Sequence, residues 1–279
     1  NSVTVKALPP MTLVFLRVII AAALLWCVIL ARGGAIPKQL SVWRTFLIMA
    51  VLNNVVPFCL IVWGQKEIGA GLAAILNATT PLFGVVVAGL FLADERATFL
   101  KSIGALIGFG GVVVMIGPQA LGGLSVGVVS QLAILGAALS YAFAGAYGRR
   151  FARMGLDPLL TSAGQVTAAS VVLLPLALAF ESPFAVAPPA PHVWASVFLL
   201  AAACTAFAYI LYFHLLATAG ATNILLVTFL VPVSAIALSA IFLGERLTPL
   251  NALGMALIGL GLTAIDGRLW RRLSRPKPA

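Results

Sequence analysis

Polar and aromatic side chains recur at helical spacing in two stretches of an otherwise apolar chain. Within each stretch they lie three or four residues apart and so share one face of a helix. The first set is Asn54, Phe58, Ile61 and Gln65, and the second, 151 positions later, is Thr205, Tyr209, Tyr212 and Leu216. An amide that faced lipid would be costly, so both faces should point inward and line a cavity. The competing interpretation is ordinary helix packing through interhelical hydrogen bonds.

Asn54 and Tyr209 are the members of these sets best suited to hold a ligand. An asparagine both donates and accepts hydrogen bonds, which suits a zwitterion without a buried full charge. A tyrosine offers a ring face to an apolar group and a hydroxyl to a polar one. We therefore predict that a small amphipathic substrate lies between the two helix faces, with Asn54 and Tyr209 as its nearest contacts.

Two prolines occupy matching positions in two further apolar stretches, at Pro81 and Pro232. A proline inside a helix has no N–H for the carbonyl four residues before it. The carbonyls of Asn77 and Thr228 are thereby freed beside polar side chains, which is what a binding site on interrupted helices requires. The competing interpretation is that the prolines only bend their helices.

Three more side chains are candidates for lining or gating the cavity. Trp63 and His214 hold matching positions near the ends of their spans, where tryptophan is usually an interfacial anchor. Tyr141 lies nearer the middle of its span. The predicted substrate-binding residues are Asn54, Phe58, Trp63, Asn77, Pro81, Tyr141, Tyr209, Tyr212, His214 and Thr228.

No pattern in the sequence predicts catalysis. All seven acids fall at span ends or in loops, so no carboxylate marks a proton relay inside the membrane. There is no phosphate-binding glycine loop, no His/Cys metal cluster and no nucleophile beside a base. We therefore expect no enzyme activity, no metal and no cofactor.

The composition is that of an integral membrane protein. Apolar residues make up 62% of the chain and charged residues 9%, too few for the polar surface of a soluble domain. The net charge of +10 would suggest nucleic acid in a soluble chain, but here we expect the cations at the membrane surface and no nucleic-acid partner. The expected partners are the lipid bilayer and a small-molecule substrate, with the protein acting as a monomer.

An internal repeat organises the chain, because the stretch 69–116 returns as 220–266. Matching motifs include Phe91-Leu92 with Phe242-Leu243, and Glu95-Arg96 with Glu245-Arg246. Two halves of apolar helices are the plan of many transporters. We predict a first half at 1–125, a second half at 126–266 and a basic cytoplasmic tail at 267–279.

We expect an all-α fold with ten transmembrane helices, five in each half. The stretch 1–8 is too short to cross a bilayer and is predicted to be the end of a truncated first helix. Arg17 interrupts the second span and either snorkels or pairs structurally, or faces a wet cavity. The other predicted spans are 10–31, 42–64, 70–93, 98–116, 126–150, 158–180, 193–218, 221–243 and 248–266.

Lysine and arginine orient the molecule, because they are enriched on the cytoplasmic side of a membrane. One set of loops and the tail carry most of them, while the opposite set carries Lys6, Lys66 and Arg246. The cation-rich set is Arg32, Lys38, Arg44, Arg96, Lys101, Arg149, Arg150, Arg153 and the tail cations. Both termini should thus be cytoplasmic in the inner (plasma) membrane. With five helices each, the halves insert as inverted repeats.

The chain resembles the drug/metabolite transporter superfamily, specifically the EamA-type exporters, and among them most the YddG-like amino acid exporters. The resemblance covers nearly the whole chain. It rests on Asn1-Ser2-Val3-Thr4-Val5-Lys6, Pro9-Pro10, Phe15-Leu16-Arg17, Thr79-Thr80-Pro81-Leu82, Leu92-Ala93-Asp94-Glu95-Arg96 and Leu243-Gly244-Glu245-Arg246. It implies ten helices, a central cavity walled by helices 1, 3, 4, 6, 8 and 9, and substrates such as amino acids, drugs and other small metabolites.

The predicted function is therefore a secondary transporter that exports small polar metabolites, amino acids above all, by alternating access. A carrier of anionic phosphorylated metabolites or nucleotide sugars is an alternative, although it would need several mid-membrane cations and only Arg17 and Lys6 are available. A membrane enzyme or lipid scramblase is disfavoured because paired catalytic groups are absent from the sequence.

Overall fold

The computed structural model describes residues 8–91, 99–116, 126–181, 190–212, 241 and 248–266. The described residues are helical with short connections, and no strand occurs among them. Within the described part of the chain, six helices are long and apolar enough to cross a membrane, and two further apolar helices are shorter. The predictions for the truncated first helix, His214, Thr228, Pro232 and the basic tail lie outside these residues, as does nearly all of the predicted ninth span.

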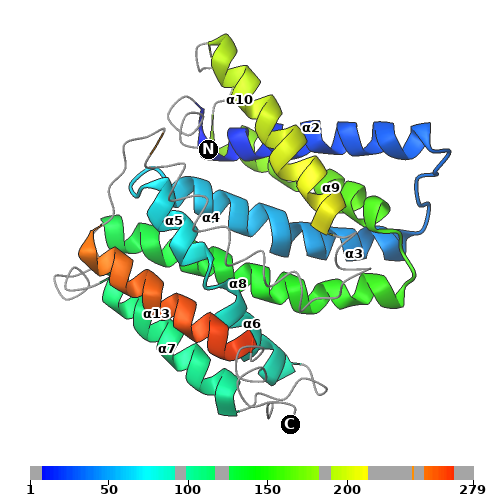
Figure 1. Ribbon diagram of the computed structural model, residues 1–279. Coiled ribbons are helices and arrows are strands. Elements are labelled where there is room, and N and C mark those ends of the chain that lie inside the picture. Colours follow the sequence, from blue (N-terminus) through cyan, green and yellow to red (C-terminus); the bar gives the residue numbers. More distant parts are fainter. Residues whose placement is uncertain are drawn as a thin grey trace, which may run out of the picture. The chain divides into compact units, whose positions relative to one another are not determined.

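The chain divides into two compact units (Figure 1). The first unit comprises residues 1–66 and 147–224, and the second comprises 67–146 and 225–279. These units differ from the predicted halves, 1–125 and 126–266, because each unit takes part of its chain from both halves. The long helix α8, Val126–Arg153, crosses from the second unit into the first.

In the first unit, α2, Pro10–Ala31, packs mainly against α9, Pro158–Phe180. Both helices begin at the predicted residue because a proline at the first helical position needs no hydrogen bond from its nitrogen. Asp157 caps α9, since its side chain accepts hydrogen bonds from Leu159 N at 2.8 Å and Leu160 N at 3.2 Å.

The N-terminus of α2 is capped from the far end of α9. Glu181 accepts hydrogen bonds from Met11 N at 2.9 Å, and from Thr12 N and the Thr12 hydroxyl at 2.8 Å each. A carboxylate at this position satisfies unbonded N–H groups and the positive end of the helix dipole. Glu181 thus fixes the register of α2 against α9.

Two rods of the first unit are interrupted by π-helical turns. The first rod runs through α3, Leu40–Ala50, η1, Val51–Val55, and α4, Val56–Gly64. The second runs through α10, Pro191–Ala201, and η3, Ala202–Phe207, and continues as helix to Tyr212. Both rods lie within predicted spans or extend them by two residues, but the sequence analysis did not predict the π turns.

The buried core of the first unit is close-packed around Phe46. Its side chain is 0% exposed and stacks on Phe151 with ring centroids 5.9 Å apart. A Cβ atom at Gly164 would collide with the Phe46 ring, so α9 approaches α3 only because this residue is glycine. The core therefore packs α3, the first segment of the first rod, against α8 and α9.

The cation-rich helix ends of the first unit lie together. In Figure 1 the end of α2, the start of α3, the end of α8 and the start of α9 meet on the right-hand side. These helix ends and the loop between α2 and α3 carry Arg32, Lys38, Arg44, Arg149, Arg150 and Arg153. A clustering of this kind is what an end of a membrane protein at the cytoplasmic surface shows.

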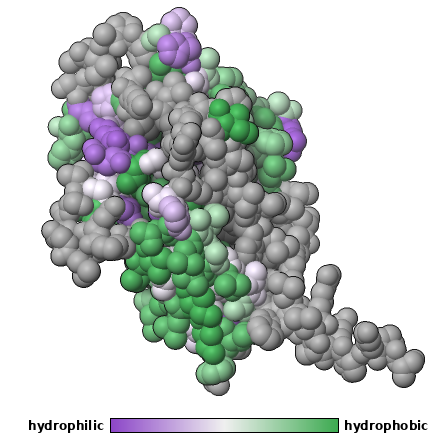
Figure 2. All heavy atoms as spheres, turned by 60° about the vertical axis from the view of Figure 1, so that its left-hand side comes forward, coloured by the Kyte–Doolittle hydropathy of each residue, from purple (hydrophilic) through white to green (hydrophobic). Residues whose placement is uncertain are grey.

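The second unit contains α5, Ala70–Asn77, α6, Thr80–Phe91, α7, Phe99–Ile116, and α13, Pro249–Asp266. The predicted fourth span is therefore two helices, since the chain breaks at Ala78 and Thr79, just before Pro81. On the face shown in Figure 2, hydrophobic residues form a broad continuous area, as expected for a surface that meets lipid.

Helices α7 and α13 cross through glycines. A Cβ at Gly104 would lie 2.6 Å from the Gly261 carbonyl oxygen, and one at Gly111 would lie 2.6 Å from that of Gly254. The sequence predicts close-packing faces on these helices, made of Gly104, Gly108 and Gly111 and of Gly254, Gly259 and Gly261. The prediction is confirmed for Gly104, Gly111, Gly254 and Gly261. It is wrong for Gly259, where a Cβ would meet nothing within 4 Å.

Candidate functional site

The π turns η1 and η3 mark the same position in the two interrupted rods, because their first residues, Val51 and Ala202, are 151 positions apart. A π turn inserts one residue into a helix and is frequent at functional sites. Pro57, which has no N–H to donate, follows η1. No proline follows η3 at the matching place, so proline is not the common cause.

Asn54 and Tyr209 meet directly between the two rods. Asn54 is 0% exposed, and its Nδ2 donates a hydrogen bond to the Tyr209 hydroxyl at 2.8 Å. The structure thus brings together the two residues that the sequence singles out as the nearest ligand contacts. They lie 155 residues apart in the chain.

Asn53 and Gln165 complete a buried polar cluster around this contact. Asn53 Nδ2 donates to Gln165 Oε1 at 3.2 Å and lies 3.4 Å from the Tyr209 hydroxyl. Gln165 comes from α9 and is 0% exposed. We call Asn53, Asn54, Gln165 and Tyr209 the amide cluster.

Two polar atoms of the amide cluster have no partner among the described residues. They are Asn54 Oδ1, an acceptor, and Gln165 Nε2, a donor, and both are buried. A buried polar group left unpaired costs about 1–3 kcal/mol. The cluster therefore offers one acceptor and one donor to a small molecule that carries both kinds of group.

Arg17 lies one helical turn away from the Asn54–Tyr209 contact. Its Nε donates to the Thr205 hydroxyl at 2.6 Å and its Nη2 to the Cys204 carbonyl at 3.2 Å. Its guanidinium carbon lies 4.2 Å from the centroid of the Phe58 ring. Phe58 is four residues after Asn54, and Thr205 is four residues before Tyr209. The contacts of Arg17 and the Asn54–Tyr209 contact are therefore about one helical turn apart along the rods.

The first unit contains three more of the predicted site residues, Phe58, Trp63 and Tyr212. Phe58 is buried beneath Arg17. Trp63, near the end of α4, is 42% exposed, as an interfacial anchor would be. Tyr212 is half-buried in the last described turn of its rod.

Asn77, Pro81 and Tyr141 belong to the second unit. Asn77 and Pro81 lie on the two sides of the break between α5 and α6. The Asn77 carbonyl leaves the helical ladder, as predicted, but the Thr80 hydroxyl donates to it at 2.7 Å. The Thr80 hydroxyl therefore uses one of the two acceptor positions of the Asn77 carbonyl. The side-chain Oδ1 of Asn77 is buried with no partner among the described residues.

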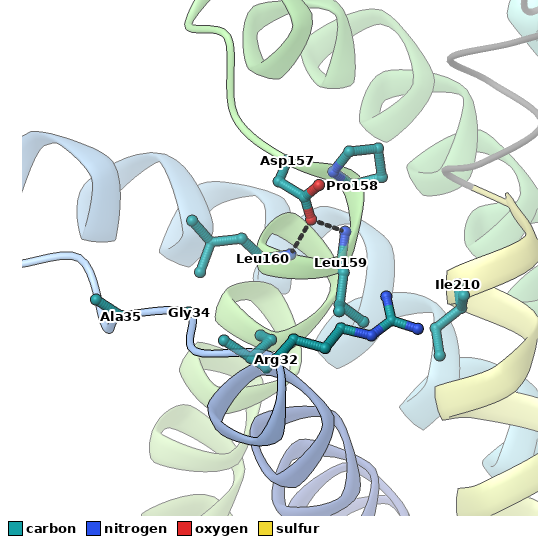
Figure 3. A pocket seen from close by; sticks show the side chains of 9 residues that line it. Arg32, Gly34, Ala35, Asp157, Pro158, Leu159, Leu160 and Ile210 are labelled. Carbon is teal, nitrogen blue, oxygen red and sulfur yellow. Dashed lines mark hydrogen bonds between the residues drawn. The ribbon is translucent and has the colours of Figure 1, made fainter.

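The first unit also contains a cavity of about 440 Å³ at its cation-rich end (Figure 3). Figure 3 shows Arg32 reaching from the end of α2 toward Ile210, while Asp157 is turned back onto the backbone of α9. The cavity is not lined by the amide cluster, but Ile210 directly follows Tyr209. Its lining residues are Ile29, Arg32, Gly34, Ala35, Asp157, Pro158, Leu159, Leu160 and Ile210.

Three residues of this candidate site, Arg17, Asn53 and Gln165, were not among the substrate-binding residues predicted from the sequence. The signal for Gln165 was present, because a glutamine in the middle of a membrane span is as costly as the asparagine that drew attention to Asn54. Arg17 was predicted to snorkel or pair structurally, or to face a wet cavity, and the structure shows it paired with Thr205 and Cys204 and placed over Phe58. No group of three or more metal-binding side chains occurs in the described part of the chain.

Apolar helices of membrane-spanning length around a buried polar cluster are the features of a multi-pass membrane protein. The chain belongs to the EamA-like transporter family of the drug/metabolite transporter superfamily, because the family model matches residues 1–117 and 129–265. It is a membrane transporter, and the resemblance found in the sequence is confirmed.

Individual relatives are also transporters. The chain is 30% identical to the uncharacterized transporter YvbV of Bacillus subtilis, over 92% of this chain and 83% of that protein. It is 30% identical to a probable terminal-alkyne amino-acid exporter of Streptantibioticus cattleyicolor, over 77% and 71%. The uncharacterized inner membrane transporter YedA of Escherichia coli is 29% identical, over 61% and 53%.

A crystal structure of another protein has the same fold. It superposes with a TM-score of 0.70, covering 98% of this chain and 92% of its own, at 24% sequence identity. At that identity the likeness is evidence for the fold alone.

Proposed function

We propose that this transporter exports amino acids and similar small polar metabolites, which bind between the η1 and η3 rods. The observation that carries the proposal is the Asn54–Tyr209 hydrogen bond, formed between two membrane helices beside an unpaired acceptor and an unpaired donor. The relative from Streptantibioticus, a probable amino-acid exporter, supports the same substrate class.

The substrate chemistry follows from the groups present. The amide cluster is uncharged and can both accept and donate, which suits the head group of a zwitterion. The Tyr209 ring adds an apolar face for a side chain. Trp63, Asn77, Pro81, Tyr141, Tyr212, His214 and Thr228 remain proposed lining residues.

We further propose ten helices in two inverted five-helix halves that alternate access to the site. The matching positions of η1 and η3 support a repeat, as do the two separate matches to the family model. In such a design one half moves against the other around a fixed site.

The test of substrate class is counterflow in proteoliposomes with radiolabelled L-phenylalanine, L-alanine and, for the phosphorylated alternative, UDP-glucose. Asn54→Ala and Tyr209→Phe should each weaken apparent affinity for the amino acid by roughly 5- to 150-fold, for a loss of about 1–3 kcal/mol. Leu90→Ala is the control, because Leu90 is 74% exposed on a lipid-facing surface. Transport of UDP-glucose alone, or unchanged affinity in both folded variants, would reject the proposal.

Both termini are proposed to be cytoplasmic in the inner membrane, on the evidence of the cation-rich helix ends. In a variant without native cysteines, a cysteine at exposed His192 should react with an impermeant maleimide added to intact cells. One at exposed Lys38 should react only after the membrane is opened. The reverse pattern would invert the topology.

A further inference from the structure

Arg17 uses only part of its hydrogen-bonding capacity. A guanidinium has five N–H donors, and the described contacts use the one on Nε and one on Nη2. Its position over the Phe58 ring leaves the edge of the guanidinium plane available, because the ring occupies the face. Arg17 is partly exposed, so this edge can be approached.

Arg17 also has no counter-ion among the described residues, where its contacts are a hydroxyl, a carbonyl and a ring. The acid attached to the same helix, Glu181, directs its oxygens to Met11 and Thr12 instead. A cation within a membrane span is costly and usually marks a pathway or a partner. A structural role in holding η3 would explain the Cys204 and Thr205 contacts but would leave the charge uncompensated.

The position of Arg17 fits a ligand held at the amide cluster. Its two attachment points, Phe58 and Thr205, are each one helical turn from Asn54 and Tyr209, a rise of about 5.4 Å along the rods. The ammonium and carboxylate of an α-amino acid, each with its hydrogen bond, span a comparable distance.

We propose that Arg17 binds the carboxylate of the transported compound while Asn54 Oδ1 accepts from its ammonium group. The inference rests on the proposed function and narrows its substrates to compounds that carry a free carboxylate beside an amine. Thr205 and the Cys204 carbonyl hold the guanidinium in place, and a substrate carboxylate would replace or join them through a charge-assisted contact with two hydrogen bonds. Arg17 lies in the predicted second span and Gln165 in the predicted seventh. Neither span is among the helices that the family resemblance implies as walls of the cavity.

The experiment measures equilibrium binding of L-phenylalanine and L-phenylalaninamide to the purified full-length protein. The amide keeps the ammonium and the ring but has no negative charge. Wild type should bind the acid roughly 10- to 150-fold more tightly than the amide, the range for hydrogen bonds to charged groups. In Arg17→Gln this ratio should fall to near one, and Arg17→Lys should retain part of it.

The acid-to-amide ratio is measured within each variant, so partial loss of folded protein does not affect it. Trp26→Phe is the matched control: it removes a 2.8 Å hydrogen bond between α2 and Thr167 and should leave the ratio unchanged. An Arg17→Gln protein that loses affinity for both ligands equally would assign Arg17 a structural role and overturn the inference. A ratio that falls in Gln165→Met but not in Arg17→Gln would overturn it as well.

The wild-type result separates the two proposals. If wild type binds acid and amide equally, amino-acid binding stands and the role of Arg17 is rejected. If it binds neither, while UDP-glucose is transported, the proposed function fails and this inference fails with it.

Discussion

Helices cross in two different ways in the two units. In the second unit, α7 and α13 meet backbone to backbone through Gly104, Gly111, Gly254 and Gly261, with no space for a Cβ atom. In the first unit, the η1 and η3 rods meet through polar side chains, and two buried polar atoms of the amide cluster, one of them on α9, lack partners among the described residues. Glycine crossings gain stability from close packing, whereas an incompletely paired polar crossing sacrifices stability. The difference fits the proposed function, in which the polar crossing of the first unit binds substrate and the glycine crossing of the second unit gives support.

The largest expected effect is at the glycine crossing. In Gly261→Val the new Cβ would collide with the Gly104 carbonyl and the backbone of Gly108, neither of which can rotate away. Overpacking of this kind should reduce the free energy of unfolding by about 1–3 kcal/mol or more. The melting temperature of the detergent-purified protein measures it. Gly259→Val, two residues away with open space around its Cβ, is the control, and equal losses in both variants would contradict the close-packing role.

The amide cluster should respond differently, with a loss of binding rather than of stability. Gln165→Met removes a buried Nε2 that has no partner among the described residues, but it also removes the Oε1 that accepts from Asn53 Nδ2. These two effects on stability oppose each other, so the melting temperature should change little, while apparent substrate affinity falls roughly 5- to 50-fold. Melting temperature and counterflow are compared in the same preparation. Loss of stability with unchanged affinity would make the amide cluster a packing feature like the glycine crossing.

The sequence predicted this contrast only in part. The Asn54–Tyr209 contact was predictable because the repeat aligned two faces and amides are too costly to face lipid. The bounds of α2 and α9 were predictable because Pro10 and Pro158 begin them. The π turns were not, since no residue pattern common to η1 and η3 specifies an inserted residue. Gly259 was assigned wrongly because spacing identifies a helix face but not which glycine touches the neighbouring backbone.

Glu181 tests whether every polar contact of the first unit serves binding. Its carboxylate caps α2 about one and a half turns before Arg17. Glu181→Ala should destabilise the protein by about 0.5–2 kcal/mol, the usual cost of a lost N-terminal cap, and should leave the acid-to-amide binding ratio intact. Glu181→Gln, which retains one acceptor oxygen, should lose less. A changed ratio with unchanged stability would place Glu181 in the binding site.

The smallest expected effect is at the break between α5 and α6 in the second unit. Variants at this break test whether its polar groups serve binding or only packing. Thr80→Val removes the hydroxyl that donates to the Asn77 carbonyl at 2.7 Å. Hydrogen bonds inside membranes average roughly 0.6 kcal/mol, so the melting temperature should fall only slightly.

Asn77→Leu removes a different feature of the same break, the buried Oδ1 that has no partner among the described residues. If this break is only a packing feature, the leucine variant keeps its affinity, since nothing but an unpaired acceptor has been lost. If Asn77 contacts substrate as proposed, affinity falls in Asn77→Leu and not in Thr80→Val. That outcome would add Asn77 to the substrate-binding residues, because its unpaired acceptor would then be kept at the expense of stability.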